Sequence, residues 1–328
     1  MAGRPMTRRK ALGLIIKAGI AATLPSVNLL AEVFRRHGQS LRYFQKMSFV
    51  MGQLLSMEVL APGPEEAARA FRTCSRLFFE YDRRLSMYRE DSEAMRLSQN
   101  AGKHLVRVSP LTLRAVNSAL HYSKQTGGVF DITIEPLLRR LGFRSPGDVR
   151  IAPLSATERD AIRRQINYRW IEVKGRQLRL AHPAMALDFG GIACGLALDA
   201  AIAALKKMDI AAAFLNISGD IACYGASEIN PVGWKVFLKN PHTGAPETER
   251  PLLLQDEALS TSGNYENFRF LKSGQKIGHI YNPATLKPAP LNGSLTVVAP
   301  TAVEADVWST AGWAGSPTPG TFRKIKLG

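Results

Sequence analysis

Apolar side chains recur at every third or fourth position in several long stretches of the chain. In residues 65–81 this spacing predicts an amphipathic helix. Residues 111–126 predict a second helix, with Ser109 as its N-cap. A third helical pattern ends near Lys207, and a fourth covers residues 302–313. The predicted helices are thus spread along the chain.

Strand-like patterns separate these helices. Residues 43–59 alternate in polarity, residues 170–180 indicate a hairpin, and residues 211–224 predict a strand followed by a turn. Shorter strands are predicted at residues 234–238, 252–254 and 294–299, and residues 145–158 are rich in loop formers. The mixture predicts an α+β fold, a single interleaved domain of mixed, mostly antiparallel sheets flanked by helices, with a loose division near residue 150.

Residues 185–199, MALDFGGIACGLALD, combine an apolar run, two glycines and a helical pattern. We expect a short strand that ends at Asp188 and turns through Gly190 and Gly191 into a helix. Free N–H groups at a helix N-terminus favour phosphate oxygens, and glycine allows close approach of a ligand. A purely structural turn is an equally good interpretation of this segment.

Charge is concentrated at the amino terminus. Residues 1–46 contain nine Lys or Arg against Glu32 alone, a net +8 of the chain's +16. The rest is mildly basic and lacks a long cationic run with interleaved aromatics, which argues against nucleic-acid binding. A hydrophobic content of 45% and a charged content of 21% are typical of a globular protein.

The first 45 residues resemble a targeting segment. Arg8 and Arg9 precede a moderately apolar run over residues 11–25, a pattern typical of twin-arginine export signals. Lys17 interrupts the run, which disfavours a membrane span. No clean cleavage site follows, so a retained anchor stays open, as does a surface amphipathic helix. We expect a periplasmic or exported protein, either free, peripheral to the inner membrane or anchored there by an uncleaved signal.

The chain has three widely spaced cysteines, Cys74, Cys194 and Cys223. There is no CxxC pair, so neither a zinc site nor a disulfide framework is indicated. One disulfide stays open in an oxidising compartment, but the sequence does not select its partners.

Eight short segments occur in an order that is more specific than any one of them. They are MG (51–52), YREDSE (88–93), TGGVFDIT (126–133) followed by PL (136–137), DFGG (188–191), NISGD (216–220), STSGNYE (260–266), HIYNP (279–283) and EADVWST (304–310). Together they resemble the ApbE family, the FAD:protein FMN transferases, over about residues 47–313. The resemblance implies a T-fold-like flavin transferase domain at residues 46–313, followed by a short irregular tail at residues 314–328.

The resemblance also implies an activity and a site. Such enzymes use Mg²⁺ and FAD, and they attach FMN through a phosphoester to a threonine, sometimes a serine, of a partner redox protein. The positions that fall where the family contacts FAD are Met51, Tyr88, Val129, Phe130, Asp131, Asp188, Ile280 and Tyr281. The metal position would use Asp306, Thr310 and the backbone carbonyl of Gly191.

Residue chemistry agrees with the metal position. Asp306 and Thr310 are four residues apart on a predicted helix, so their oxygens share one face. Mg²⁺ prefers hard oxygen ligands and usually takes one or two carboxylates. His279 is the candidate general base, because imidazole titrates near neutral pH. A solvated carboxylate at Asp306 and a structural histidine at 279 are the simpler alternatives.

The chain departs from the family pattern at several places. Cys194 stands where lysine is usual, Asn282 replaces an aspartate, and Leu286 replaces a glycine. Ser309 occupies a position where some members have a second acid. The tail lacks a recognisable helix or strand, which would leave a sheet edge uncovered.

Three functions are compatible with these patterns. The first is an FMN transferase acting on a redox partner, favoured by Asp306 and Thr310. The second is a non-catalytic FAD- or FMN-binding accessory protein of an exported or membrane redox system, favoured by Cys194 and the short tail. The third is a basic surface-binding module, which would require the order of the eight segments to be a coincidence.

Overall fold

The structure, a computed structural model, describes residues 35–36, 39–147, 150–226, 233–245 and 251–327. Most of the predicted targeting segment, residues 1–45, lies outside these ranges, including Arg8 and Arg9, whereas residues 42–45 already form part of a strand. No helix in the described ranges is long and apolar enough to cross a membrane.

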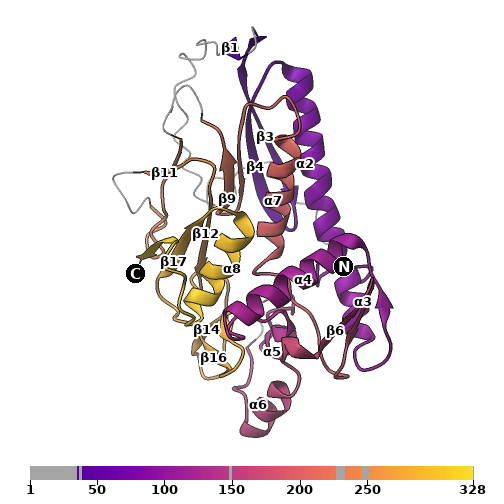
Figure 1. The fold of residues 1–328 in the computed structure, drawn as a ribbon. Coiled ribbons are helices and arrows are strands. Elements are labelled where there is room, and N and C mark those ends of the chain that lie inside the picture. The colour runs from indigo at the N-terminus through magenta and orange to yellow at the C-terminus, as the bar shows by residue number, and fades with distance from the viewer. Residues whose placement is uncertain (1–34, 37–38, 148–149, 227–232, 246–250, 328) are drawn as a thin grey trace, which may run out of the picture.

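A seven-stranded sheet organises the molecule, with strand order β18-β17-β12-β9-β8-β4-β3 (Figure 1). All neighbouring strands in it are antiparallel. The strands are β3 (Arg42–Val50), β4 (Gln53–Ala61), β8 (Ala212–Ile217), β9 (Asp220–Tyr224), β12 (Ala258–Gly263), β17 (Ser294–Ala299) and β18 (Arg323–Leu327). The predicted α+β class with a mostly antiparallel sheet is confirmed.

Three long helices cover one face of this sheet: α2 (Pro64–Leu85), α7 (Ala193–Leu205) and α8 (Ala302–Trp313) (Figure 1). Alternate residues of β4, such as Leu55 and Met57, point into this layer and are fully buried. On α2, buried Phe71 and Phe78 are seven residues apart, as the helical period requires. The largest apolar core lies here.

The opposite face of the sheet carries a smaller apolar cluster. Leu60, Phe214 and Val298 belong to it, and the hairpin of β10 (Trp234–Val236) and β11 (Leu252–Leu254) packs over them. The ring centroids of Phe214 and Trp234 are 5.4 Å apart. The sheet is therefore covered on both faces over its central strands.

The remaining elements lie mainly at one end of the large sheet (Figure 1). The helices are α3 (Glu93–Gln99), α4 (Pro110–Gln125), η1 (Ile132–Ile134), α5 (Glu135–Arg140), α6 (Ala156–Arg163) and η2 (Tyr168–Trp170). A three-stranded sheet has the order β5-β7-β6, formed by β5 (Val106–Arg107), β6 (Ile171–Lys174) and β7 (Gln177–Leu180). Two-stranded sheets are formed by β1 (Arg35–Arg36) with β2 (Gln39–Ser40), β13 (Phe268–Phe270) with β14 (Lys276–Gly278), and β15 (Tyr281–Asn282) with β16 (Lys287–Pro288).

Helices α7 and α8 cap each other. Asp199 of α7 accepts hydrogen bonds from the first backbone N–H groups of α8, at Ala302 (2.7 Å) and Val303 (3.0 Å). Asp306 of α8 accepts one from the N–H of Gly195, in the first turn of α7, at 3.0 Å. Each carboxylate satisfies N–H groups that have no partner inside their own helix. This exchange fixes where α8 crosses α7.

Several sequence expectations need correction. Residues 185–189 form no strand, because the N–H groups of Leu187 and Asp188 bond to Ser98 Oγ and the Ile132 carbonyl instead of a neighbouring strand. Residues 43–59 are a hairpin rather than one strand, since the chain turns at residues 51–52. The loop-rich stretch ends early, because α6 begins inside it.

The expected irregular tail is also wrong in part. Residues 323–327 form β18, which pairs along β17 and covers the sheet edge that we expected to be open. Ile325 and Leu327 alternate with lysines and pack against the smaller apolar cluster. The period-two pattern was present in the sequence, but the preceding Pro/Gly-rich stretch obscured it.

We predict that Gly195→Ala lowers the free energy of unfolding by about 1–3 kcal/mol, measured by denaturant titration. A Cβ at Gly195 would lie 2.6 Å from the Ala302 carbonyl oxygen and 2.7 Å from Val303 Cα, so the two helices would have to separate. Gly320→Ala is the control, because a Cβ there meets nothing within 4 Å. Equal stability of the two variants would contradict the close crossing.

Candidate active site

A buried polar cluster lies where α8 packs on β9 and β12. Ser260 Oγ donates a hydrogen bond to Asp220 Oδ1 at 2.5 Å, and Ser309 Oγ lies 3.1 Å from Ser260 Oγ. Ser262 Oγ is 2.9 Å from Ser309 Oγ and 3.3 Å from Thr310 Oγ1. The hydroxyls form a continuous chain from Asp220 to Thr310.

Asp306 and Asp220 are the two carboxylates of this cluster. Burial raises the pKa of Asp306 well above its ordinary value, and the charge of Asp220 adds to the increase. Burial also raises the pKa of Asp220, to about 6, although the Ser260 hydrogen bond opposes this. Within the described ranges, neither carboxylate forms an ion pair with Lys or Arg. Two buried acids without a cation favour a bound positive charge.

Gly191 lies against the same cluster. A Cβ at Gly191 would be 3.1 Å from Thr310 Oγ1 and 3.3 Å from a ring carbon of Phe130. Thr310 is one helical turn after Asp306 on α8. The structure therefore brings the three residues of the expected metal position to one place.

The donor atoms available at this cluster are oxygens, which hard cations prefer. Across the described part of the chain, no group of three or more His, Cys, Asp or Glu side chains is arranged to hold a metal ion. A cation at this cluster would thus depend on one or two carboxylates, a hydroxyl and a backbone carbonyl. Such all-oxygen sets suit Mg²⁺, which also retains water and takes phosphate oxygens from a substrate.

Cys194 adjoins both carboxylates. Its buried Sγ accepts a hydrogen bond from Gln53 Nε2 at 3.7 Å, and burial together with the nearby charges of Asp220 and Asp306 raises the pKa of the thiol. The thiol is therefore neutral near pH 7. It supplies no positive charge to the cluster, in contrast to the lysine that is usual at this position of the family pattern.

A second cluster surrounds Arg144, which sequence analysis missed. Its guanidinium lies 3.0 Å from an Asp188 carboxylate oxygen and 2.7 Å from Glu135, whose side chain is buried. It also donates to Tyr88 Oη at 2.9 Å and lies over the Tyr88 ring, 5.2 Å from the centroid. Burial lowers the pKa of Arg144, but the two neighbouring carboxylates outweigh this effect and raise the pKa above its ordinary value.

The two clusters meet at the turn before α7. Asp188 Oδ1 accepts a hydrogen bond from the Gly190 N–H at 2.8 Å, and Gly191 contacts the hydroxyl cluster. Phe130 is buried beside Gly191. A continuous path of contacts therefore runs from Tyr88 through Asp188 and the turn beside Phe130 to Asp306 on α8.

Other residues that we expected to contact the flavin form interactions within the protein instead. Asp131 caps η1 by accepting from the Thr133 N–H at 2.8 Å, and its second oxygen accepts from the Tyr168 N–H at 2.9 Å. Met51 and Val129 are partly buried against the main core.

Ile280 and Tyr281 are also buried. The Ile280 N–H donates to Asn264 Oδ1 at 3.0 Å, while Tyr281 pairs with Pro288 and packs in a third apolar cluster around Leu137 and Phe143. Both side chains therefore help to hold the segment that follows His279.

His279 lies near the Arg144 cluster. Its Nδ1 is 3.2 Å from the Asn267 carbonyl oxygen, so this nitrogen carries the proton and Nε2 is left as the acceptor. Burial lowers the pKa of the imidazole and the positive charge of Arg144 lowers it further, while the Asn267 hydrogen bond and the charge of Asp188 oppose this. The ring is neutral near pH 7 and can accept a proton at Nε2.

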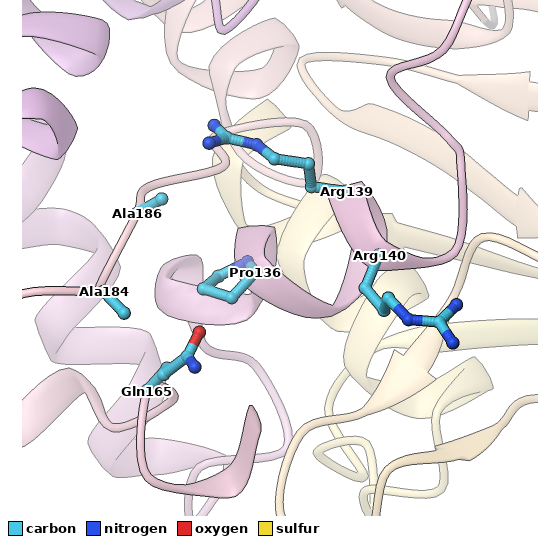
Figure 2. Close-up of a pocket in the computed structure, with 6 residues that line it drawn as sticks. All are labelled: Pro136, Arg139, Arg140, Gln165, Ala184 and Ala186. Atoms are coloured by element: carbon cyan, nitrogen blue, oxygen red, sulfur yellow. The ribbon is translucent and has the colours of Figure 1, made fainter. Parts of the chain in front are cut away.

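A hollow of about 380 Å³ lies outside both clusters, beside α5. It is lined by Pro136, Arg139, Arg140, Gln165, Ala184 and Ala186. Figure 2 shows Arg139 extending toward Ala186, while Arg140 points away from that segment. None of the residues expected to bind FAD or metal lines this hollow, so the hollow does not mark the candidate site.

Comparison with known proteins identifies the family. The sequence model described as the ApbE family matches residues 51–320. The chain belongs to the ApbE family. A FAD:protein FMN transferase of Vibrio cholerae is 27% identical over 252 residues, 76% of this chain and 74% of that protein. One of Salmonella typhimurium is 28% identical over 267 residues, 79% of this chain and 75% of that protein.

Solved structures of the family share the fold. The flavin transferase ApbE from Vibrio cholerae superposes with a TM-score of 0.72 at 23% identity, covering 88% of this chain and 97% of that one. The ApbE protein from Thermotoga maritima gives 0.72 at 25% identity, covering 83% and 87%. The family and fold expected from the eight ordered segments are confirmed.

Proposed function

We propose that this chain transfers FMN from FAD to a threonine or serine hydroxyl of an acceptor protein, with Mg²⁺ as the metal. Its family membership and its FAD:protein FMN transferase relatives support this activity. The observation that carries the proposal is the pair of buried carboxylates, Asp306 and Asp220, which meets Gly191 and Thr310 without a counter-charge in the described ranges.

Asp306, Thr310 and the Gly191 carbonyl would hold the Mg²⁺. When bound, the metal would neutralise negative charge that develops on the pyrophosphate. Asp306 is held in place by the Gly195 N–H, and Ser262 restrains the Thr310 hydroxyl. Asp220 would not bind the metal directly but would stabilise it through its negative charge and through the serine hydroxyls.

FAD would lie along the path from Tyr88 to Asp306. The exposed ring of Tyr88 offers an aromatic surface for a flavin or an adenine, and Phe130, buried beside Gly191, would support the floor of the site. Asp188 and Arg144 would bind polar groups of the FAD, since both have charged atoms next to the Gly190 turn. Met51, Val129, Asp131, Ile280 and Tyr281 would shape the walls of this site.

The transfer itself is a substitution at phosphorus. The acceptor hydroxyl oxygen forms a bond to the FMN phosphorus, the bond from that phosphorus to the bridging oxygen breaks, and AMP leaves with that oxygen. His279 Nε2 would take the hydroxyl proton and pass it to solvent or to AMP. A neutral imidazole with Nδ1 fixed by Asn267 is suited to this role.

A non-catalytic FAD-binding protein is the second candidate. The observation that favours it is Cys194, because its neutral thiol would supply no positive charge to the phosphates of a bound FAD. Such a protein would bind FAD and leave every acceptor unlabelled.

We also propose that the protein is exported, free or anchored at the inner membrane, with a redox protein of the same compartment as its acceptor. The support is residues 1–45, in which Arg8 and Arg9 precede an apolar run. Replacing both arginines by lysine should retain the protein in the cytoplasm, measured by cell fractionation. Unchanged distribution of that variant would contradict twin-arginine export.

We predict that the protein with FAD, Mg²⁺ and an acceptor domain bearing a reactive threonine gives acceptor fluorescence that survives denaturation. Asp306→Ala should reduce the rate of labelling by about 100-fold or more, because the metal loses its carboxylate. His279→Gln should reduce it by a similar factor and leave FAD affinity within about twofold, because only the proton acceptor is lost.

Asp160→Ala is the matched control. This carboxylate is exposed on α6 and pairs only with Arg163 at 3.3 Å in the described structure, so labelling should be unchanged. If the wild-type protein labels the acceptor and Asp306→Ala labels it at the same rate, the proposed role of Asp306 in metal binding is refuted. FAD binding without any labelling would favour the non-catalytic alternative.

A further inference from the structure

Strand β3 forms an edge of the large sheet. It is nine residues long and pairs with β4 on one side, and no strand in the described ranges pairs with its other side. Long edge strands attract further strands, and proteins usually shorten, bend or cover them. The register of β3 with β4 is continuous from Arg42 to Val50, so no bulge interrupts it.

The turn determines which backbone groups of β3 face outward. Val50 pairs with Gln53 across Met51 and Gly52, whose φ angles of 51° and 71° are those of a type I′ turn. In such a two-residue hairpin the flanking pair exchanges both hydrogen bonds, and the pattern then alternates. The residues with outward N–H and C=O groups are therefore Tyr43, Gln45, Met47 and Phe49.

Two of these residues, Met47 and Phe49, also expose large apolar side chains. Phe49 is 76% exposed and Met47 is 44% exposed, although both are large and hydrophobic. They lie on the sheet face away from α2, whereas Phe44 and Val50 pack against the main core. Outward-facing backbone groups and two exposed apolar side chains thus coincide on one strand.

This edge leads to the active site. β3 continues through the turn into Gln53, whose Nε2 contacts Cys194 Sγ beside the carboxylate pair. A polypeptide paired along β3 would therefore end close to the place where FMN transfer is proposed.

We propose that the outer edge of β3 binds an extended segment of the acceptor protein as an additional antiparallel strand. This inference rests on the proposed transferase function and identifies where its protein substrate docks. The segment would carry apolar side chains at alternate positions, to cover Met47 and Phe49, and acidic side chains opposite exposed Arg42 and Lys46.

Other occupants fit the edge less well. A lipid bilayer could cover Phe49 but would form no ladder of hydrogen bonds with the backbone of residues 43–49. A second copy paired along the whole of β3 would set Lys46 directly opposite the partner's Lys46, and like charges at directly opposed positions are destabilising.

The test uses the full chain, an acceptor protein and two variants of β3. Gln45→Pro removes an outward N–H and leaves the β4 ladder intact, and Phe49→Asp removes the apolar contact. Each should raise the acceptor KM by about tenfold, with kcat and FAD affinity within about twofold. Phe79→Asp on α2, where Phe79 is 52% exposed, is the control and should leave the KM unchanged.

Acceptor binding measured by calorimetry separates this proposal from the transferase function. Weaker acceptor binding by both β3 variants supports docking, even where the wild-type protein transfers no FMN. Normal transfer by the wild-type protein with unchanged KM and unchanged affinity in both variants overturns docking and leaves the transferase function standing. Loss of vesicle binding or of a dimer in these variants, with acceptor affinity intact, assigns the edge to those occupants instead.

Discussion

The structure depends on the burial of two carboxylates, Asp220 and Asp306, at the junction of β9, β12, α7 and α8. Burial of acids is costly without compensation, and here the compensation comes from the Gly195 N–H and serine hydroxyls. The same Asp306 that accepts a hydrogen bond from the first turn of α7 is the carboxylate that we propose as the ligand of the cation. Fold and proposed chemistry therefore share one side chain, and a substitution at Asp306 affects both.

The close crossing of α7 and α8 brings the hydroxyl cluster and the Arg144 cluster to the same turn. Gly195 allows the two helices to approach, and Asp199 of α7 caps the N-terminus of α8. The turn at Gly190 and Gly191 lies between the two clusters. Residues far apart in sequence thus meet around a short segment. Asp306 occupies the N–H of Gly195, so this N–H group of the first turn is not available to a phosphate oxygen.

Local patterns predicted the helices well, because their apolar faces and caps, such as Ser109, are encoded within a few residues. The order of eight segments predicted the family and placed Gly191, Asp306 and Thr310 together. The sequence alone assigned no role to Asp220, Ser260 or Arg144. Important partners of these side chains are distant in the chain, so no local pattern of residues indicates the contacts. It also missed β18, whose pairing with β17 is decided by tertiary contact.

The central claim is that Asp306 and Thr310 hold a divalent cation at the pyrophosphate of FAD. The most direct measurement is anomalous X-ray diffraction from crystals of the protein grown with Mn²⁺, which takes the same oxygen ligands as Mg²⁺, and FAD. The account predicts an anomalous peak bonded to oxygens of Asp306, Thr310 and the Gly191 carbonyl, next to the phosphates. Bound FAD without a peak there, or Mn²⁺ held by other residues, would contradict it.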